Sequence, residues 1–236
     1  MAATVWHVVA PGETAASIAA DFHLRLADVG RWNQIVSPYP VHVDETLRLT
    51  APRTDLPAWR TRIDAVTPAM VNWDGRRGCP TQPGNLRRVW VSYLDLRGDY
   101  HDGSIIVRKD LAAATQRIFF TLFRWRYRIM AMAPMSVNMP GETDMGIVTA
   151  GYNCRPVDGT HTWSEHAYGT AIDINPLQNP MLRGSHPGGR YAARSRHLIG
   201  MVHADGAVRA FTENGFHWGG NWSSLKDYMH FSITNR

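Results

Sequence analysis

Residues 164–180 read Ser-Glu-His-Ala-Tyr-Gly-Thr-Ala-Ile-Asp-Ile-Asn-Pro-Leu-Gln-Asn-Pro, and this stretch carries the densest chemical pattern in the chain. His166 and Asp173 lie seven residues apart, with Gly169 between them. Residues 171–174, Ala-Ile-Asp-Ile, are typical of a strand, and a turn at Gly169 would bring His166 back beside Asp173. An imidazole and a carboxylate placed together can share one metal ion, and both ligand types suit Zn²⁺.

A second cluster lies near the C-terminus, where residues 215–231 read Gly-Phe-His-Trp-Gly-Gly-Asn-Trp-Ser-Ser-Leu-Lys-Asp-Tyr-Met-His-Phe. Asp227 and His230 have a spacing at which two side chains on one turn point the same way. A zinc ion bound by His166, Asp173 and His230 would keep an open fourth position for water, as catalytic zinc sites do. Asp227, near the metal but not bound to it, is then placed to accept the proton of that water.

The two clusters together resemble the VanY-like D-alanyl-D-alanine carboxypeptidase/endopeptidase family, in particular the phage-endolysin type that cleaves peptidoglycan stem peptides. The likeness runs over residues 78–231 and includes the motifs at 91–93 (V-S-Y), 152–155 (Y-N-C-R), 164–180 and 216–231. This resemblance implies that the metal is Zn²⁺, that its ligands are His166, Asp173 and His230, and that Asp227 is the general base.

Roles are also predicted for four further residues, the first of them from the resemblance. Arg155 matches a family arginine that binds substrate and stabilises the oxyanion, since a guanidinium suits a developing negative charge. The alternative is a structural arginine paired with a nearby carboxylate. Ser164 is expected to hydrogen-bond either the substrate or a zinc ligand, and support of a zinc ligand is the favoured role. Trp218 and Trp222 are expected in the core or in the wall of the substrate cleft, with Trp218 a predicted substrate contact.

The remaining histidines are predicted to play no part in the zinc site. His161 and His217 lie close to the motifs, but neither falls on a ligand position of the family. His186, His197 and His203 lie in Gly/Arg-rich sequence and are expected to be solvated.

Upstream of the metal motifs, the sequence alternates between strand and helix patterns. Residues 89–94 and 104–108 are predicted strands, and a helix is predicted over 110–126 with Asp110 as its cap. A loop rich in Gly and Pro is expected from 134 to 159. Together with the resemblance, these patterns predict an α+β zinc peptidase domain with a central antiparallel sheet.

The first fifty residues form a separate pattern. Residues 5–9 alternate as a short strand, and Thr14 can cap a helix that carries Ile18 and Phe22 on one face. A second helical pattern follows around Val29, and a second strand is predicted over 46–50. The result is a small β-α-α-β unit.

This unit resembles a LysM domain in its order of signals: the opening strand, P-G-E-T, S-I-A, R-W-N and V-D-E-T-L-R-L. LysM modules bind N-acetylglucosamine polymers such as peptidoglycan or chitin. The resemblance implies a glycan groove with Gly12, Glu13 and Thr14 on one side and residues 36–40 on the other. The sequence at 39–43, Tyr-Pro-Val-His-Val, departs from the usual pattern, so the last loop is expected to have a different shape.

We therefore expect a LysM domain over residues 1–50, a Pro-containing linker over 51–60 and a peptidase domain over 61–236. The first 50 residues hold three Arg against five acidic residues, a net charge of −2, whereas the whole chain carries +5. The remainder therefore carries +7, which favours an anionic partner such as a cell-wall polymer. No nucleic-acid-binding motif is present, and no run is apolar enough to span a membrane, so neither partner is expected. A monomer is expected.

Two features bear on the compartment. Cys79 and Cys154 are the two cysteines of the chain and exclude a Cys-based zinc site, but they leave one disulfide or two free thiols equally open. Residues 1–7 lack the basic-then-apolar order of a signal peptide. The expectation is a phage lysin made in the host cytoplasm that acts on the wall after release, with a secreted bacterial enzyme as the alternative.

The leading hypothesis is an endolysin-like peptidoglycan hydrolase: the LysM unit holds the glycan while a zinc metallopeptidase of the D,D-carboxypeptidase/L-alanyl-D-glutamate endopeptidase type cleaves stem-peptide or cross-link amide bonds. Three bonds remain open to it: L-alanyl-D-glutamate, D-alanyl-D-alanine and the D-alanyl cross-link to a diamino acid. The alternative is a non-catalytic peptidoglycan-binding protein whose peptidase-like domain keeps a structural zinc.

Overall fold

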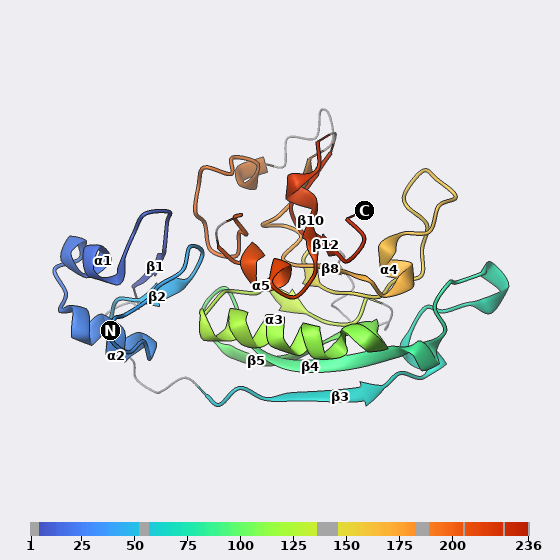
Figure 1. Cartoon of the computed structure of the whole chain (residues 1–236), viewed down its shortest axis with the longest axis horizontal. Coiled ribbons are helices and arrows are strands. Elements are labelled where there is room, and N and C mark those ends of the chain that lie inside the picture. Colours follow the sequence, from blue (N-terminus) through green and yellow to red (C-terminus); the bar gives the residue numbers. More distant parts are fainter. Residues whose placement is uncertain are drawn as a thin grey trace.

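The structure is a computed structural model of the chain. It describes residues 5–51, 57–135, 146–182, 189–204, 206–223 and 225–235. In Figure 1 a small N-terminal unit lies beside a larger α+β domain, and the described residues include no helix long and apolar enough to cross a membrane.

The N-terminal unit is a β-α-α-β fold, as predicted. Strand β1 (Trp6–Val8) pairs antiparallel with β2 (Thr46–Arg48). Helices α1 (Ala15–Asp21) and α2 (Leu26–Asn33) lie between the two strands in the sequence. Thr14 caps α1 in a capping box with Ser17, which satisfies backbone groups that the first helical turn leaves unpaired. Its core is a buried apolar cluster built from Val9, Ile18, Ala19, Val29, Leu47 and Leu49.

One detail of this unit was predicted wrongly. Helix α1 ends at Asp21, so Phe22 lies beyond it and stays 43% exposed instead of joining Ile18 in the core. The ring of Phe22 meets that of His7 edge-on, at 5.5 Å between centroids.

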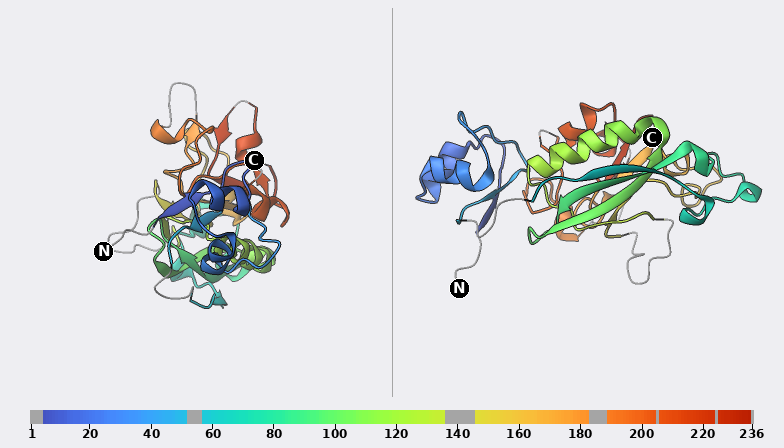
Figure 2. Two further views of the ribbon diagram at one scale, coloured as in Figure 1. Left: turned by 90° about the vertical axis from the view of Figure 1, so that its left-hand side faces the viewer. Right: turned by 90° about the horizontal axis from the view of Figure 1, so that it is seen from below.

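The large domain is built on a three-stranded antiparallel sheet in the order β3-β4-β5 (Figure 1). Its strands are β3 (Thr61–Ala65), β4 (Leu86–Leu94) and β5 (Tyr100–Arg108), and the register pairs Val89 with Ile105. Helix α3 (Ala112–Arg124) packs on this sheet with Ala114, Ile118 and Leu122 buried. Figure 2 shows α3 lying along one face of the sheet.

The predicted cap of α3 is wrong. Asp110 lies in a 3-10 turn, η4 (Lys109–Leu111), and its carboxylate accepts two hydrogen bonds from the Arg108 guanidinium at 2.7 and 2.8 Å. The helix begins after Leu111, which makes no side-chain capping bond.

A second three-stranded antiparallel sheet has the order β10-β12-β8, and its strands lie above α3 in the view of Figure 1. Its strands are β10 (His217–Trp218), β12 (His230–Ser232) and β8 (Ala171–Asp173). Two-residue strands form two smaller pairs, β6 (Ala131–Met132) with β7 (Val148–Thr149) and β9 (Met181–Leu182) with β11 (Lys226–Asp227). The short helices are α4 (Glu165–Tyr168) and α5 (Val208–Thr212), and the other 3-10 turns are η1 (Pro68–Met70), η2 (Gly75–Arg77), η3 (Pro83–Asn85), η5 (Gly189–Tyr191) and η6 (Gly219–Asn221).

The N-terminal unit packs against the large domain through specific contacts. The imidazole of His42 stacks on Trp125 with 4.3 Å between ring centroids, and the guanidinium of Arg128 lies 4.0 Å over the ring of Trp6. Asp44 hydrogen-bonds the backbone N–H of His203 at 2.7 Å. The expectation that His197 and His203 are solvated is therefore wrong, because His203 is buried and both rings lie beside Asp44. His186 lies outside the described residues.

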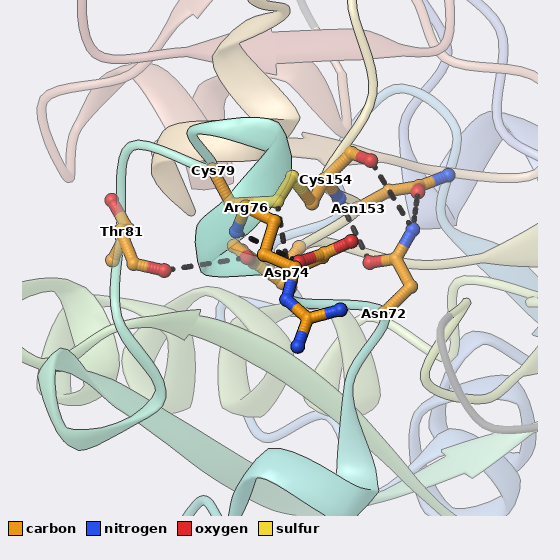
Figure 3. Close-up of a disulfide and its surroundings, with 8 residues drawn as sticks. Asn72, Asp74, Arg76, Cys79, Thr81, Asn153 and Cys154 are labelled. Atoms are coloured by element: carbon orange, nitrogen blue, oxygen red, sulfur yellow. Dashed lines mark hydrogen bonds between the residues drawn. A yellow bond between two sulfur atoms is a disulfide. The ribbon is translucent and has the colours of Figure 1, made fainter.

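The question of the cysteines is resolved in favour of a disulfide: Cys79 is bonded to Cys154 (Figure 3). Asn72 joins the same two segments by hydrogen bonds. Its amide oxygen accepts from the backbone N–H of Cys154 at 2.9 Å, and its amide nitrogen donates to the side-chain oxygen of Asn153 at 2.7 Å. The bond closes a loop across a sequence separation of 75 residues. It therefore ties the segment before β4 to residues 152–155, which precede α4.

Replacing both cysteines by serine is expected to lower the free energy of unfolding by about 2–4 kcal/mol, because the unfolded chain regains the entropy that the long closed loop removes. Chemical denaturation monitored by circular dichroism measures the change. The wild type treated with a reducing agent serves as the matched control and should move in the same direction. An unchanged denaturation midpoint in both cases would contradict this role.

Candidate metal centre

His166 is positioned by a single helical turn with defined ends. The Ser164 hydroxyl oxygen accepts from the backbone N–H of His166 and caps α4. Gly169 ends the helix at a φ of +69°, and a Cβ there would come within 2.8 Å of the Arg108 backbone nitrogen. Only glycine fits this turn without strain, so the chain reverses here and leads directly into β8.

Asp173 and His230 are brought together by strand pairing. Strand β8 pairs antiparallel with β12, and the register places Asp173 directly opposite His230. His230 Nδ1 lies 3.1 Å from one carboxylate oxygen of Asp173, and His166 Nε2 lies 3.1 Å from the other. All three side chains are buried. The predicted turn at Gly169 and the predicted grouping of these residues therefore describe the geometry correctly.

The electrostatics of the three residues favour an ionised carboxylate between the two rings. Burial alone would raise the pKa of Asp173, but the charges and hydrogen bonds of His166 and His230 outweigh burial and hold it well below its usual value of 3.8. His166 Nδ1 lies 2.7 Å from the carbonyl oxygen of Gly151. A carbonyl can only accept, so Nδ1 carries the proton and Nε2 presents its lone pair to the site.

These donors fit a zinc ion. Their ligand atoms all lie within 4.8 Å of one another. Two ligands bound tetrahedrally to one zinc at about 2.0–2.1 Å lie about 3.3 Å apart, close to the 3.1 Å separations observed. Two neutral imidazoles and one carboxylate are a ligand set that zinc accepts, with a further position left for a non-protein ligand.

Asp227 stands beside this group without joining it. It lies on β11, and its side chain lines the same cavity, of about 560 Å³, as the three ligands. Its Oδ1 atom is buried and has no hydrogen-bond partner among the described residues. Burial, and then the charge of Asp173, raise the pKa of Asp227 to about 6. A carboxylate of this kind is well suited to accept a proton near neutral pH.

Arg155 also lies on the wall of this cavity. Its Nη1 is 3.8 Å from a carboxylate oxygen of Asp158, a side chain that is 96% exposed. Its Nε is buried and has no hydrogen-bond partner in the part of the chain that the structure describes. The structural alternative for Arg155 required a firm carboxylate partner, and the long contact to exposed Asp158 is a weak one.

The other predicted site residues divide between two environments. Ser164 supports His166 as its helix cap, in line with the expected contact to a zinc ligand. Trp218 is not on the cavity wall: it is buried in the core, where its indole N–H donates to the Tyr228 carbonyl at 2.9 Å. The substrate contact predicted for Trp218 therefore does not fit the structure. Trp222 does line the cavity, with its ring 5.4 Å from that of His230.

Sequence reasoning missed part of the cavity wall. Apolar side chains to which no role was assigned also line it, namely Trp163, Met181, Leu225 and Met229. The acceptor that orients His166 is the backbone carbonyl of Gly151, and a backbone group leaves no residue-type signal in a sequence.

In the N-terminal unit, the side chains of the predicted groove residues Glu13 and Thr14 make hydrogen bonds within the unit. The Glu13 carboxylate lies 2.7 Å from His7 Nε2 and accepts from the backbone N–H of Ala10 at 2.7 Å. Thr14 caps α1, and Gly12 adopts a φ of +83° in the turn before it. On the opposite side, Val36 and Pro40 line a cavity of about 670 Å³ together with residues of α3 and the segment after it, whereas Gly12, Glu13 and Thr14 are not among its lining residues.

The raised pKa of Asp227 predicts that burial of its charge lowers the free energy of unfolding by an amount that depends on pH. The folded state binds the proton of the Asp227 carboxyl group more tightly than the unfolded state does. The contribution of Asp227 to stability therefore falls as the pH rises from about 4 through about 6. In chelator-treated protein, Asp227→Asn is expected to raise the free energy of unfolding by on the order of 2 kcal/mol at pH 8 and by much less at pH 4.

Urea denaturation at the two pH values measures this difference. Asp158→Asn, a change at an exposed carboxylate on the same cavity, is the matched control and should leave stability unchanged. Equal effects of Asp227→Asn at pH 4 and pH 8 would contradict the assigned pKa.

Comparison with known protein families gives two matches. Residues 7–50 match the LysM domain, and residues 158–233 match the D-alanyl-D-alanine carboxypeptidase family. The second match contains His166, Asp173, Asp227 and His230 and begins three residues after Arg155. No curated protein and no solved structure matches the chain. The chain is thus a modular peptidoglycan-targeted peptidase, in which a LysM domain precedes a domain of the VanY-like D-alanyl-D-alanine carboxypeptidase family.

Proposed function

We propose that the protein is an endolysin-like peptidoglycan hydrolase that cleaves amide bonds of the stem peptide or of the cross-link. The observation that carries the proposal is the pairing of two kinds of group in one cavity: three buried residues that fit zinc, and the Asp227 carboxylate with an unpartnered oxygen. A purely structural zinc site does not require a buried carboxylate with an unpartnered oxygen beside its ligands.

His166, Asp173 and His230 would hold the zinc ion. When bound there, zinc supplies Lewis acidity that polarises the scissile carbonyl and makes water a better nucleophile. Asp227 takes the proton of the attacking water and then gives it to the leaving amine, so a single carboxyl group serves as base and acid in turn.

Arg155 is proposed to bind the substrate and to stabilise the oxyanion. Its guanidinium lies on the wall of the same cavity, and its positive charge acts on Asp227 through space. Ser164 is proposed as a positioning residue, because it caps the turn that aims His166 at the site. Trp222, rather than Trp218, is proposed to contact a bound peptide, because it lines the cavity.

The LysM domain is proposed to hold the N-acetylglucosamine backbone of peptidoglycan. The loop of residues 36–40 supports this role, because Val36 is 79% exposed on the wall of a cavity and can pack against a sugar face. The Gly12–Thr14 turn is proposed as the other side of the groove, through its backbone groups, since the side chains of Glu13 and Thr14 already have internal partners.

The Cys79–Cys154 disulfide supports action outside a reducing cytoplasm, where such bonds persist. This fits an enzyme that works on the cell wall, whether it is released from a phage-infected host or secreted by a bacterium.

Asp227→Ala is expected to lower kcat for peptidoglycan cleavage by about 10²–10⁴-fold while zinc is retained, because the proton acceptor is removed but the ligands stay. His166→Ala is expected to lose the zinc of this site together with the activity. Mass spectrometry of fragments released from purified peptidoglycan, with and without chelator, measures activity and identifies the bond cleaved. Asp158→Ala is the control, and full activity of Asp227→Ala would refute the mechanism.

Binding to glycan is tested separately from cleavage by using the Asp227→Ala background. Val36→Asp is expected to reduce the fraction of protein that sediments with insoluble peptidoglycan several-fold, since a charge replaces the apolar contact with the sugar. Val5→Asp, at another exposed valine of the same unit, is the matched control. Soluble N-acetylglucosamine oligomers should compete with the wall, and binding that they leave unchanged would exclude glycan recognition by this groove.

A further inference from the structure

A second cluster of metal-binding side chains lies where the LysM domain meets the peptidase domain. Asp44 comes from the loop before β2, whereas His197 and His203 come from the segment that precedes α5. The ligand atoms of the three residues all lie within 4.8 Å of one another, and Asp44 and His203 are buried. None of the three belongs to the site already described.

The hydrogen bonds of His203 fix which ring nitrogen faces Asp44. Its Nε2 lies 3.0 Å from the carbonyl oxygen of Arg196, and a carbonyl can only accept, so Nε2 carries a proton. Its Nδ1 is in close contact with one carboxylate oxygen of Asp44. In the neutral ring this places a nitrogen lone pair against a carboxylate, which is unfavourable unless a proton or a metal ion lies between them.

His197 brings a second ring nitrogen to Asp44 that is left without a hydrogen bond in the described part of the chain. Its Nδ1 lies 3.6 Å from the same oxygen of Asp44 and has no hydrogen-bond partner among the residues the structure describes. Its ring stacks on His203 at 4.0 Å between centroids, with 25° between the planes. Two protonated rings stacked this closely would repel each other, and one shared carboxylate oxygen cannot neutralise both.

The arrangement repeats the features that define the first site. At both places, the second nitrogen of a histidine meets a backbone carbonyl, Gly151 for His166 and Arg196 for His203. The second oxygen of Asp44 accepts from the backbone N–H groups of His203 and Ala207 at 2.7 and 3.2 Å, which holds its first oxygen toward the rings. Such outer contacts orient metal ligands and select their tautomers.

We propose that Asp44, His197 and His203 form a second zinc site that joins the LysM domain to the peptidase domain. Two imidazoles and a carboxylate are ligands that zinc accepts, and a single divalent cation satisfies all three at once. Because its ligands come from both domains, the bound ion fixes the position of one domain on the other.

The zinc content of the full-length protein tests this proposal. Each variant is loaded with Zn²⁺, dialysed against metal-free buffer and measured by inductively coupled plasma mass spectrometry. Wild type is expected to hold about two zinc ions per chain, and His197→Ala about one. His166→Ala is also expected to hold about one, retained between the domains, and the double variant none. His161→Ala, at an exposed histidine, should match wild type.

The variants separate this proposal from the proposed function. If the wild type holds one zinc ion, and that ion is lost in His166→Ala but kept in His197→Ala, the second site does not exist. Asp44 and His203 are then an ion pair without metal. Equal zinc content in wild type and His197→Ala would also exclude the second site. Asp44→Asn keeps an oxygen that can accept the bonds from His203 and Ala207, so it should lose one zinc while circular dichroism shows an unchanged fold.

Discussion

The antiparallel pairing of β8 with β12 is the constraint on which the catalytic domain depends. It sets Asp173 directly opposite His230, although the two lie 57 residues apart in the chain. Side chains alternate between the faces of a strand, so a shift of one residue in this register would turn one ligand away from the other. The same strands bury Ile172 and Phe231 in the main core. The free energy that packs the core therefore also holds the ligands in place.

The parts of the site that could be predicted from the sequence are those set by short-range geometry. His166 and Asp173 are joined by a Gly169 turn that only glycine fits, and such a turn is readable from its residues. Residue type does not say on which side of a sheet a side chain lies when the strand is two residues long. In β10, His217 is exposed and Trp218 is buried in the core, so the structure gives no support to the substrate contact predicted for Trp218.

Contacts across long separations were the least predictable. His203 meets Asp44 from 159 residues away, and nothing in the sequence around either residue marks the encounter. The Cys79–Cys154 pair was open for the same reason, since two cysteines are compatible with a bond or with free thiols until the fold brings them together. The predicted cap of α3 was wrong for a local reason: the Asp110 carboxylate accepts hydrogen bonds from Arg108 and does not bind the backbone N–H groups of the helix.

The nested pairing of β8 with β12 and of β9 with β11 also bears on how such a protein can evolve. The two pairs form a closed stem that holds Asp173, Asp227 and His230. The LysM domain is contacted by residues outside these strands, namely His203, Trp125 and Arg128. Attachment of the LysM domain and binding of the metal in the peptidase domain thus depend on different residues, so substitutions at the contact between the domains can change how the LysM domain is attached without replacing His166, Asp173 or His230.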